Sequence, residues 1–167
     1  DFLILRGNHD DGELPVLLTS LPNVRTFGGG RPVCYRYGRV AVYGCEDCTV
    51  PPEDFSLSAD DCNIVMLHGD LRESASRDGI DLRAWQGRCC DYLALGHYHT
   101  AKMAALDSRG TYAYSGCPAG RGFDECGEKG YIRLDETDGR IRASFVPLPG
   151  RRMQSVTADL TSCASLA

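Results

Sequence analysis

The sequence has no apolar run long enough to cross a membrane as a helix, so no membrane association is expected. It also has no excess of basic residues: 18 Lys and Arg stand against 23 Asp and Glu, a net charge of −5. A surface that coats nucleic acid should be basic, so the net charge argues against this class of protein. A nuclease is not excluded, because a metal ion can supply positive charge where a phosphate lies.

A second Cys-x-x-Cys pair is also missing, although the sequence contains nine cysteines. Their number is odd and they are scattered through strand-like segments, whereas a small disulfide scaffold is shorter and rich in loops. We therefore expect mainly reduced, partly buried thiols and a cytoplasmic protein. A structural zinc site at Cys45 and Cys48, completed by Cys62 or by Cys89 and Cys90, is the less favoured alternative.

Helix signals are few and short, at Glu13–Ser20 and Leu82–Trp85, and internal repeats are absent. Apolar runs bounded by turn residues predict many strands instead. We expect strands at 2–5, 24–27, 33–37, 39–43, 63–67, 91–95, 102–106, 111–115, 131–135, 140–147 and 151–159. This pattern favours the strand-rich C-terminal portion of a layered α/β sandwich whose early helices lie upstream. Thr161–Ala167 is expected to be a frayed or linking tail.

All four histidines of the chain, His9, His68, His97 and His99, lie at or just beyond the ends of apolar strands. A single histidine is most often an ordinary polar residue, but four at strand ends are harder to explain in that way. Side chains at adjacent strand ends meet at one edge of a sheet, where ligands bind in α/β folds. Neutral imidazole binds divalent transition metals, and the amide oxygen of Asn8 can join it. The sequence therefore predicts a metal site.

Three motifs carry a family resemblance. Gly7-Asn8-His9-Asp10, then His68-Gly69, then Gly96-His97-Tyr98-His99 resemble, in order, the last three motifs of the calcineurin-like metallophosphoesterases. The segment from Tyr114 to Glu125 is similar to one in SbcD-like DNA repair exonucleases. The resemblance implies that residues 1–149 are the C-terminal part of a phosphoesterase domain, and that 150–167 are a final strand and tail or the start of a linker. The family's first two motifs, which supply a bridging aspartate, are then expected upstream.

The resemblance also implies roles for individual residues. Asn8, His68 and His97 would bind one metal ion, and His99 would bind the other. His9 would be catalytic, protonating the leaving oxygen or stabilising charge there, with Asp10 orienting it. The two ions are expected to be manganese, with zinc or iron as alternatives.

Two further residues are candidates for substrate binding. Tyr98 could stack on a base or sugar, and a packing role is the equal alternative. Arg121 could contact phosphate, although an exposed arginine without a partner is the more common outcome.

The expected function is therefore that of a manganese-dependent phosphodiesterase, a DNA repair exonuclease with DNA and an SbcC-like ATPase as partners. One alternative is a metallophosphatase for small phosphate esters, since a metal site does not set the substrate class. The other is a non-catalytic scaffold with an incomplete metal site. Without the bridging aspartate, weak or no activity is expected of this chain alone, and an uncovered sheet edge makes a homodimer an open alternative.

Overall fold

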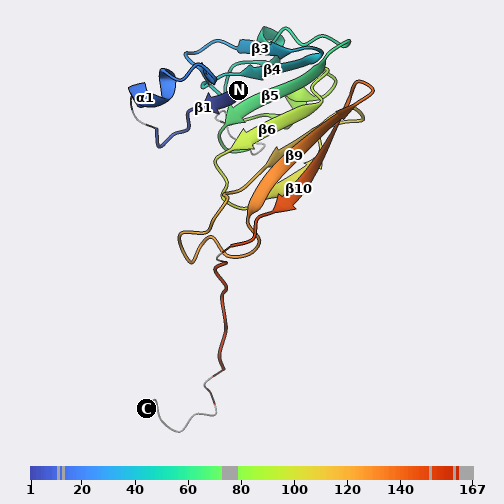
Figure 1. The fold of residues 1–167 in the computed structure, drawn as a ribbon. Coiled ribbons are helices and arrows are strands. Elements are labelled where there is room, and N and C mark those ends of the chain that lie inside the picture. The colour runs from blue at the N-terminus through green and yellow to red at the C-terminus, as the bar shows by residue number, and fades with distance from the viewer. Residues whose placement is uncertain (11, 13, 73–78, 151, 160, 162–167) are drawn as a thin grey trace.

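The computed structural model describes residues 1–10, 12, 14–72, 79–150, 152–159 and 161 (Figure 1). Its largest element is a six-stranded sheet. In spatial order the sheet contains β3 (Val33–Tyr37), β4 (Val40–Gly44), β5 (Cys62–His68), β6 (Tyr92–Gly96), β8 (Thr111–Tyr114) and β7 (Lys102–Ala105). The four inner strands run parallel, and β3 and β7 run antiparallel to their neighbours at the two edges.

Two smaller sheets accompany the central one. Strand β1 (Phe2–Leu5) pairs in parallel with β2 (Val24–Phe27), while β9 (Gly130–Thr137) and β10 (Arg140–Pro147) form an antiparallel hairpin. The fully buried ring of Phe27 lies against Gly44 of β4, where an added Cβ would come within 2.4 Å of the ring. This close contact fixes the β1–β2 pair against the central sheet.

Along β5 the hydrophobic core follows from the alternation of side chains between the two faces of the sheet. Val65 and Leu67 of β5 are buried and pack with Leu93 of β6 and with Trp85, whereas Met66 points to the other face and is half-buried. Trp85 belongs to the short helix α2 (Leu82–Trp85), which therefore helps to close the core face. The 3-10 turn η1 (Pro52–Asp54) lies just before Phe55, another core residue.

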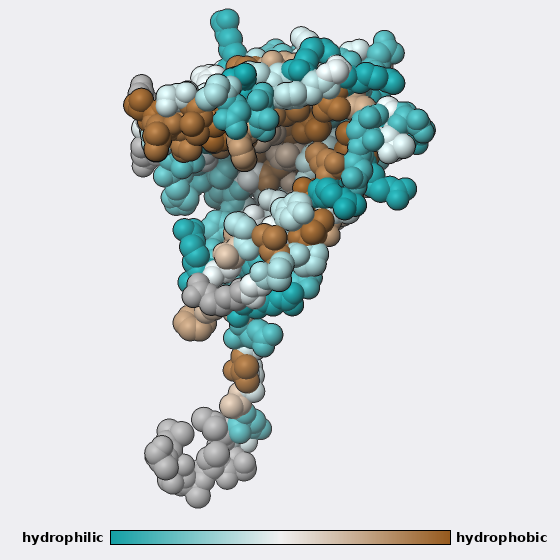
Figure 2. Space-filling model, viewed as in Figure 1, coloured by the Kyte–Doolittle hydropathy of each residue, from teal (hydrophilic) through white to brown (hydrophobic). Residues whose placement is uncertain are grey.

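Apolar residues also gather on the surface at the N-terminal end of the molecule. Helix α1 (Val16–Thr19) follows Pro15 and has no buried residue; Val16 and Leu17 are 77% and 76% exposed. Figure 2 shows this end as a brown area in the region where Figure 1 draws α1. Among the described residues no helix is long and apolar enough to cross a membrane.

The predicted fold class, a layered α/β sandwich, is wrong. Strands make up 37% of the structure and helix 7%, and the sheet arrangement is β-solenoid-like, with β4, β5, β6 and β8 stacked in parallel in chain order. A layered α/β fold needs helices long enough to cover the sheet faces. Here α1 and α2 have four residues each.

The local predictions agree better with the structure. Ten predicted strands are present, with ends that shift by at most two residues, and the hairpin at Gly38 is confirmed by the antiparallel pairing of β3 and β4. Gly38 has φ +61°, which favours glycine. The predicted strand over 151–159 is wrong for the described part, because residues 152–159 form no strand and extend away from the sheets (Figure 1). Glu13, Arg151 and residues 162–167 of the predicted tail lie outside the described residues.

Candidate metal centre

Three segments end at the same edge of the structure. Strands β5 and β6 are parallel neighbours, and His68 at the end of β5 is in register with Gly96 at the end of β6. His97 follows directly. The loop after β1 carries Asn8 to the same place, because Gly7 lies against the ring of His68. The predicted convergence at strand ends therefore occurs for Asn8, His68 and His97, which we call the Asn8–His68–His97 cluster.

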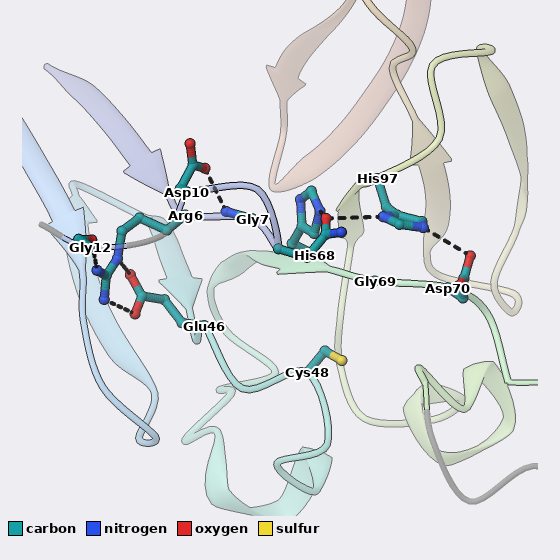
Figure 3. Close-up of a pocket in the computed structure, with 11 residues that line it drawn as sticks. Arg6, Gly7, Asp10, Gly12, Glu46, Cys48, His68, Gly69, Asp70 and His97 are labelled. Carbon is teal, nitrogen blue, oxygen red and sulfur yellow. Dashed lines mark hydrogen bonds and ion pairs between the residues drawn. The ribbon is translucent and has the colours of Figure 1, made fainter. Parts of the chain in front are cut away.

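The amide oxygen of Asn8 lies at the centre of this cluster. His68 Nε2 lies 2.9 Å from Asn8 Oδ1, and His97 Nδ1 lies 3.3 Å from the same oxygen. The centroids of the two imidazole rings are 5.4 Å apart, and the rings are nearly perpendicular. Figure 3 shows His68 and His97 facing each other across this contact.

These distances fit a shared cation. Nitrogen and oxygen ligands lie about 2.1 Å from a transition-metal ion, so adjacent donors are about 3.0 Å apart at a right angle and about 3.4 Å apart in a tetrahedron. The observed separations of 2.9 and 3.3 Å lie close to these two values. Two imidazole nitrogens and one amide oxygen can therefore bind one ion with small adjustments.

The surroundings of both imidazole rings also favour metal binding. Burial lowers the pKa of His68, the neighbouring His97 lowers it further, and Asp10 partly opposes these effects. A lower pKa favours the neutral ring that metals require. His97 Nε2 lies 3.4 Å from Asp70 Oδ1, so a neutral His97 with its hydrogen on Nε2 would keep Nδ1 available to a metal (Figure 3). A carboxylate behind a ligating histidine commonly holds the ring in this way.

The ring of His68 occupies a slot between two glycines. A Cβ on Gly7 would lie 2.4 Å from Cε1 of His68, and one on Gly96 would lie 2.7 Å from Nδ1. Real Cβ atoms are essentially never found at such distances. Any side chain at either position would therefore displace the imidazole, so both glycines fix the position of a cluster residue.

The loop that carries Asn8 is closed by Asp10. Gly7 N donates to Asp10 Oδ2 over 2.8 Å, and Asp10 N donates back to Gly7 O over 3.1 Å. The described contacts of Asp10 thus hold the loop, and they do not include the expected contact with His9. His9 itself is exposed at the loop tip, next to Asn8.

His99 is separate from the cluster. Its Nδ1 lies 2.6 Å from Oε1 of Glu125, which is almost fully buried. Of the two residues predicted to bind substrate, Arg121 donates its backbone N–H to Glu125 Oε2 over 2.5 Å. These contacts lower the pKa of Glu125; the Arg121 N–H contributes most, and the bond from His99 adds to it.

Tyr98 lies between the two histidines in sequence and packs by its ring. The ring meets those of Tyr114 and His97 edge to face, with centroid distances of 4.7 and 5.6 Å. Tyr98 is still 48% exposed. Both roles considered for Tyr98, packing and stacking on a substrate, are compatible with this placement.

A cavity of about 510 Å³ opens in front of the cluster. Its wall includes Arg6 and Glu46, which form a two-pronged ion pair with both N···O distances at 2.6 Å (Figure 3). Cys48 also lines the cavity. Among the described residues no three His, Cys, Asp or Glu side chains come together to hold a metal, so the Asn8 amide is the third donor of the cluster.

Comparison with protein-family models and with curated proteins gives no match for this chain. The predicted resemblance to calcineurin-like metallophosphoesterases, and to SbcD-like exonucleases within them, is therefore wrong. The fold agrees with this correction, because a metallophosphoesterase is a helix-rich α/β protein and the described part of this chain is strand-rich with two short α-helices.

Sequence reasoning did not assign a role to Glu125 or to the two glycines beside His68. Glu125 is 26 residues from His99, and no spacing rule connects a loop carboxylate to a distant imidazole. One sequence signal does point to the glycines: Gly7 and Gly96 each directly precede a candidate ligand.

Proposed function

We propose that this chain carries a metal-dependent phosphodiesterase site at the Asn8–His68–His97 cluster. The observation that supports it most directly is the convergence of three metal-ligand atoms on one point, at 2.9 and 3.3 Å, beside an open cavity. A divalent cation bound there would polarise a phosphoryl oxygen and lower the pKa of a bound water.

The charge of the ligand set supports a phosphate ester as substrate. Asn8, His68 and His97 are all neutral as ligands, so a bound cation would keep its full positive charge. Asp70 contacts His97 on the side away from Asn8 and therefore offsets that charge only from a distance. Arg6, the arginine in the cavity wall, is already paired with Glu46. An anionic substrate would therefore be attracted mainly by the cation.

In this proposal His9 acts as the proton donor. It is exposed, directly follows the ligand Asn8, and lies on a loop that Asp10 and Gly7 close by two hydrogen bonds. Protonation of the leaving oxygen by such a group typically contributes about 10²–10⁴-fold to the rate. DNA is the first phosphodiester to test, with small diesters and monoesters beside it.

The proposal is tested by calorimetric titration of the protein with Mn²⁺ and Zn²⁺ and by hydrolysis assays. The substrates are linear duplex DNA, bis-para-nitrophenyl phosphate and para-nitrophenyl phosphate. The variants are Asn8→Ala and His97→Ala, with Asn23→Ala as the matched exposed control. We expect the two cluster variants to lose measurable metal binding and diester hydrolysis, while Asn23→Ala retains both.

The variant His9→Ala tests the role of the proton donor separately from metal binding. We expect this variant to bind metal as the unsubstituted chain does, and kcat for diesters to fall by about 10²–10⁴-fold. If Asn8→Ala binds both cations as well as the unsubstituted chain, the cluster is not the metal site. Cleavage of the monoester alone would reject a phosphodiesterase in favour of a phosphatase.

A further inference from the structure

His99 is an exposed imidazole held by buried groups. Its side chain is 51% exposed, yet Nδ1 lies 2.6 Å from a carboxylate oxygen of Glu125, whose side chain is 6% exposed. The other oxygen of that carboxylate accepts the Arg121 N–H at 2.5 Å. Each carboxylate oxygen therefore has a nitrogen donor.

The backbone of His99 is held from the same loop. Its carbonyl oxygen accepts a hydrogen bond from Lys129 Nζ at 3.0 Å, and Cys117 Sγ donates to it at 3.5 Å. Lys129 is 4% exposed. Burying a carboxylate and an ammonium group is costly unless both find partners, and here both find them on His99. A surface histidine with no further role does not need this support.

We propose that Glu125 is a positioning residue for His99 and fixes the tautomer in which Nδ1 carries the hydrogen and Nε2 carries the lone pair. A carboxylate can only accept hydrogen bonds, so the nitrogen that faces it must donate. The exposed Nε2 is then the atom of the ring that can bind a cation or accept a proton.

This inference deepens the proposed function and rests on it for its catalytic part. His99 is two residues from the ligand His97, and the ring of Tyr98 between them contacts the ring of His97. His99 thus follows the same strand end, that of β6, as the cluster residue His97. Removing a carboxylate that orients a functional histidine typically lowers activity or metal affinity by about 10–100-fold.

The test combines nitrogen NMR of the histidine rings with diester kinetics, in the unsubstituted chain and in Glu125→Ala and Glu125→Gln. The control is Glu128→Gln, which removes an exposed carboxylate of the same loop that pairs with Arg152. We expect the His99 signals to show a protonated Nδ1 and an unprotonated Nε2, and Glu125→Ala to shift them toward the other tautomer. Glu125→Gln, which keeps one acceptor oxygen, should show a smaller shift, and Glu128→Gln none.

The kinetic expectation is a fall in kcat of about 10–100-fold for Glu125→Ala with KM little changed. Titration with Zn²⁺ then separates the two uses of the lone pair. A shift of the Nε2 signal with added metal identifies a cation as its partner, and an unshifted signal with reduced kcat identifies a proton; both support the inference. An unchanged tautomer in a folded Glu125→Ala protein overturns it. Because the tautomer is measured without substrate, a failure of the proposed function alone would leave that part standing.

Discussion

At the scale of single residues, the candidate site depends on two glycines, because a glycine has no Cβ atom. The imidazole of His68 fits because Gly7 and Gly96 have no Cβ where the ring lies. A histidine side chain can swing away from a new methyl group with little loss of stability. Its ligand atom would then leave the position beside Asn8. Metal affinity and stability should therefore respond differently to the same substitution.

Gly96→Ala provides the test. We expect the free energy of unfolding to change by about 1 kcal/mol or less, while Mn²⁺ affinity falls by about 10–100-fold, as for other disturbed ligand supports. Calorimetric titration and urea unfolding measure the two quantities. Gly30→Ala is the control, because an added Cβ there has nothing within 4 Å. Metal affinity equal to that of the control would show that the ring is not held by this slot.

Cys90 leads to a second residue-scale prediction, on alkaline stability. The thiol is 1% exposed, and burial, together with the charges of Asp91 and Asp107, raises its pKa to about 12. A raised pKa in the folded state means that the unfolded chain releases the proton first. The stabilisation is therefore complete below the unfolded pKa of about 8.5 and is lost as the pH rises toward 12.

The measurement is the free energy of unfolding from about pH 9 to pH 11. Stability should fall with pH in the unsubstituted chain, and in Cys90→Ala the fall should be shallower by up to about 1.4 kcal/mol per pH unit, the value for one proton. Cys34→Ala, at an exposed thiol, should keep the original slope. Equal slopes in all three proteins would contradict a buried, neutral Cys90.

Part of the arrangement of the candidate site could be predicted from the sequence. The rule that neighbouring parallel strands end at one edge correctly placed His68 beside His97. Asn8 follows β1 of a different sheet and reaches them through its loop. The rule could not predict the direction of His99, because the chain beyond β6 leaves the strand and His97 has φ +119°. Once the backbone leaves the regular strand, the alternation that gives residues i and i+2 one face no longer applies.

At the scale of elements, the strands were predictable and their layers were not. A strand is marked locally by apolar runs and by turn residues such as Gly38, so ten strands were located within one or two residues. The helical layers were expected in residues upstream, and no periodic helix pattern in this chain supported them. Where the sequence itself has few helix signals, the structure has few helices.

The inner strands are joined at the end away from the cavity by a polar network. Asp91, 5% exposed, accepts two hydrogen bonds from Arg109 at 2.9 and 3.0 Å and one from the Asn63 backbone at 2.8 Å. Asn63 lies on β5, Asp91 directly precedes β6, and Arg109 lies in the turn before β8. One buried carboxylate thus connects three neighbouring strands.

Replacing this carboxylate should weaken the sheet without affecting the site. We expect Asp91→Ala to lower the free energy of unfolding by about 3 kcal/mol, because it leaves the Arg109 charge and a buried N–H without their partner. Asp135→Ala removes a carboxylate from an exposed pair with Arg133 and should cost about 1 kcal/mol or less. Denaturant unfolding measures both. Equal costs would show that the network is no stronger than a surface ion pair.

At the scale of the whole molecule, the acidic balance decides how a polyanion can approach. A protein with net charge −5 repels DNA at long range, and the cation proposed at the cluster attracts phosphate only at short range. Salt screens the long-range part first, because the Debye length falls to about 8 Å at 0.15 M. The salt dependence of the rate can therefore tell which of these two fields dominates.

If the proposed phosphodiesterase acts on DNA, kcat/KM for duplex DNA should stay level or rise as NaCl increases from about 50 to 200 mM at saturating Mn²⁺. A protein that neutralises 6–10 phosphates with basic side chains loses about 10³–10⁵ in DNA affinity over the same range. Here the repulsion that salt removes should compensate for the weaker short-range attraction. The small diester bis-para-nitrophenyl phosphate, which carries a single charge, serves as the control and should show little dependence. A steep fall with DNA alone would mean that DNA binds through a local basic surface, and that the net charge does not control the encounter.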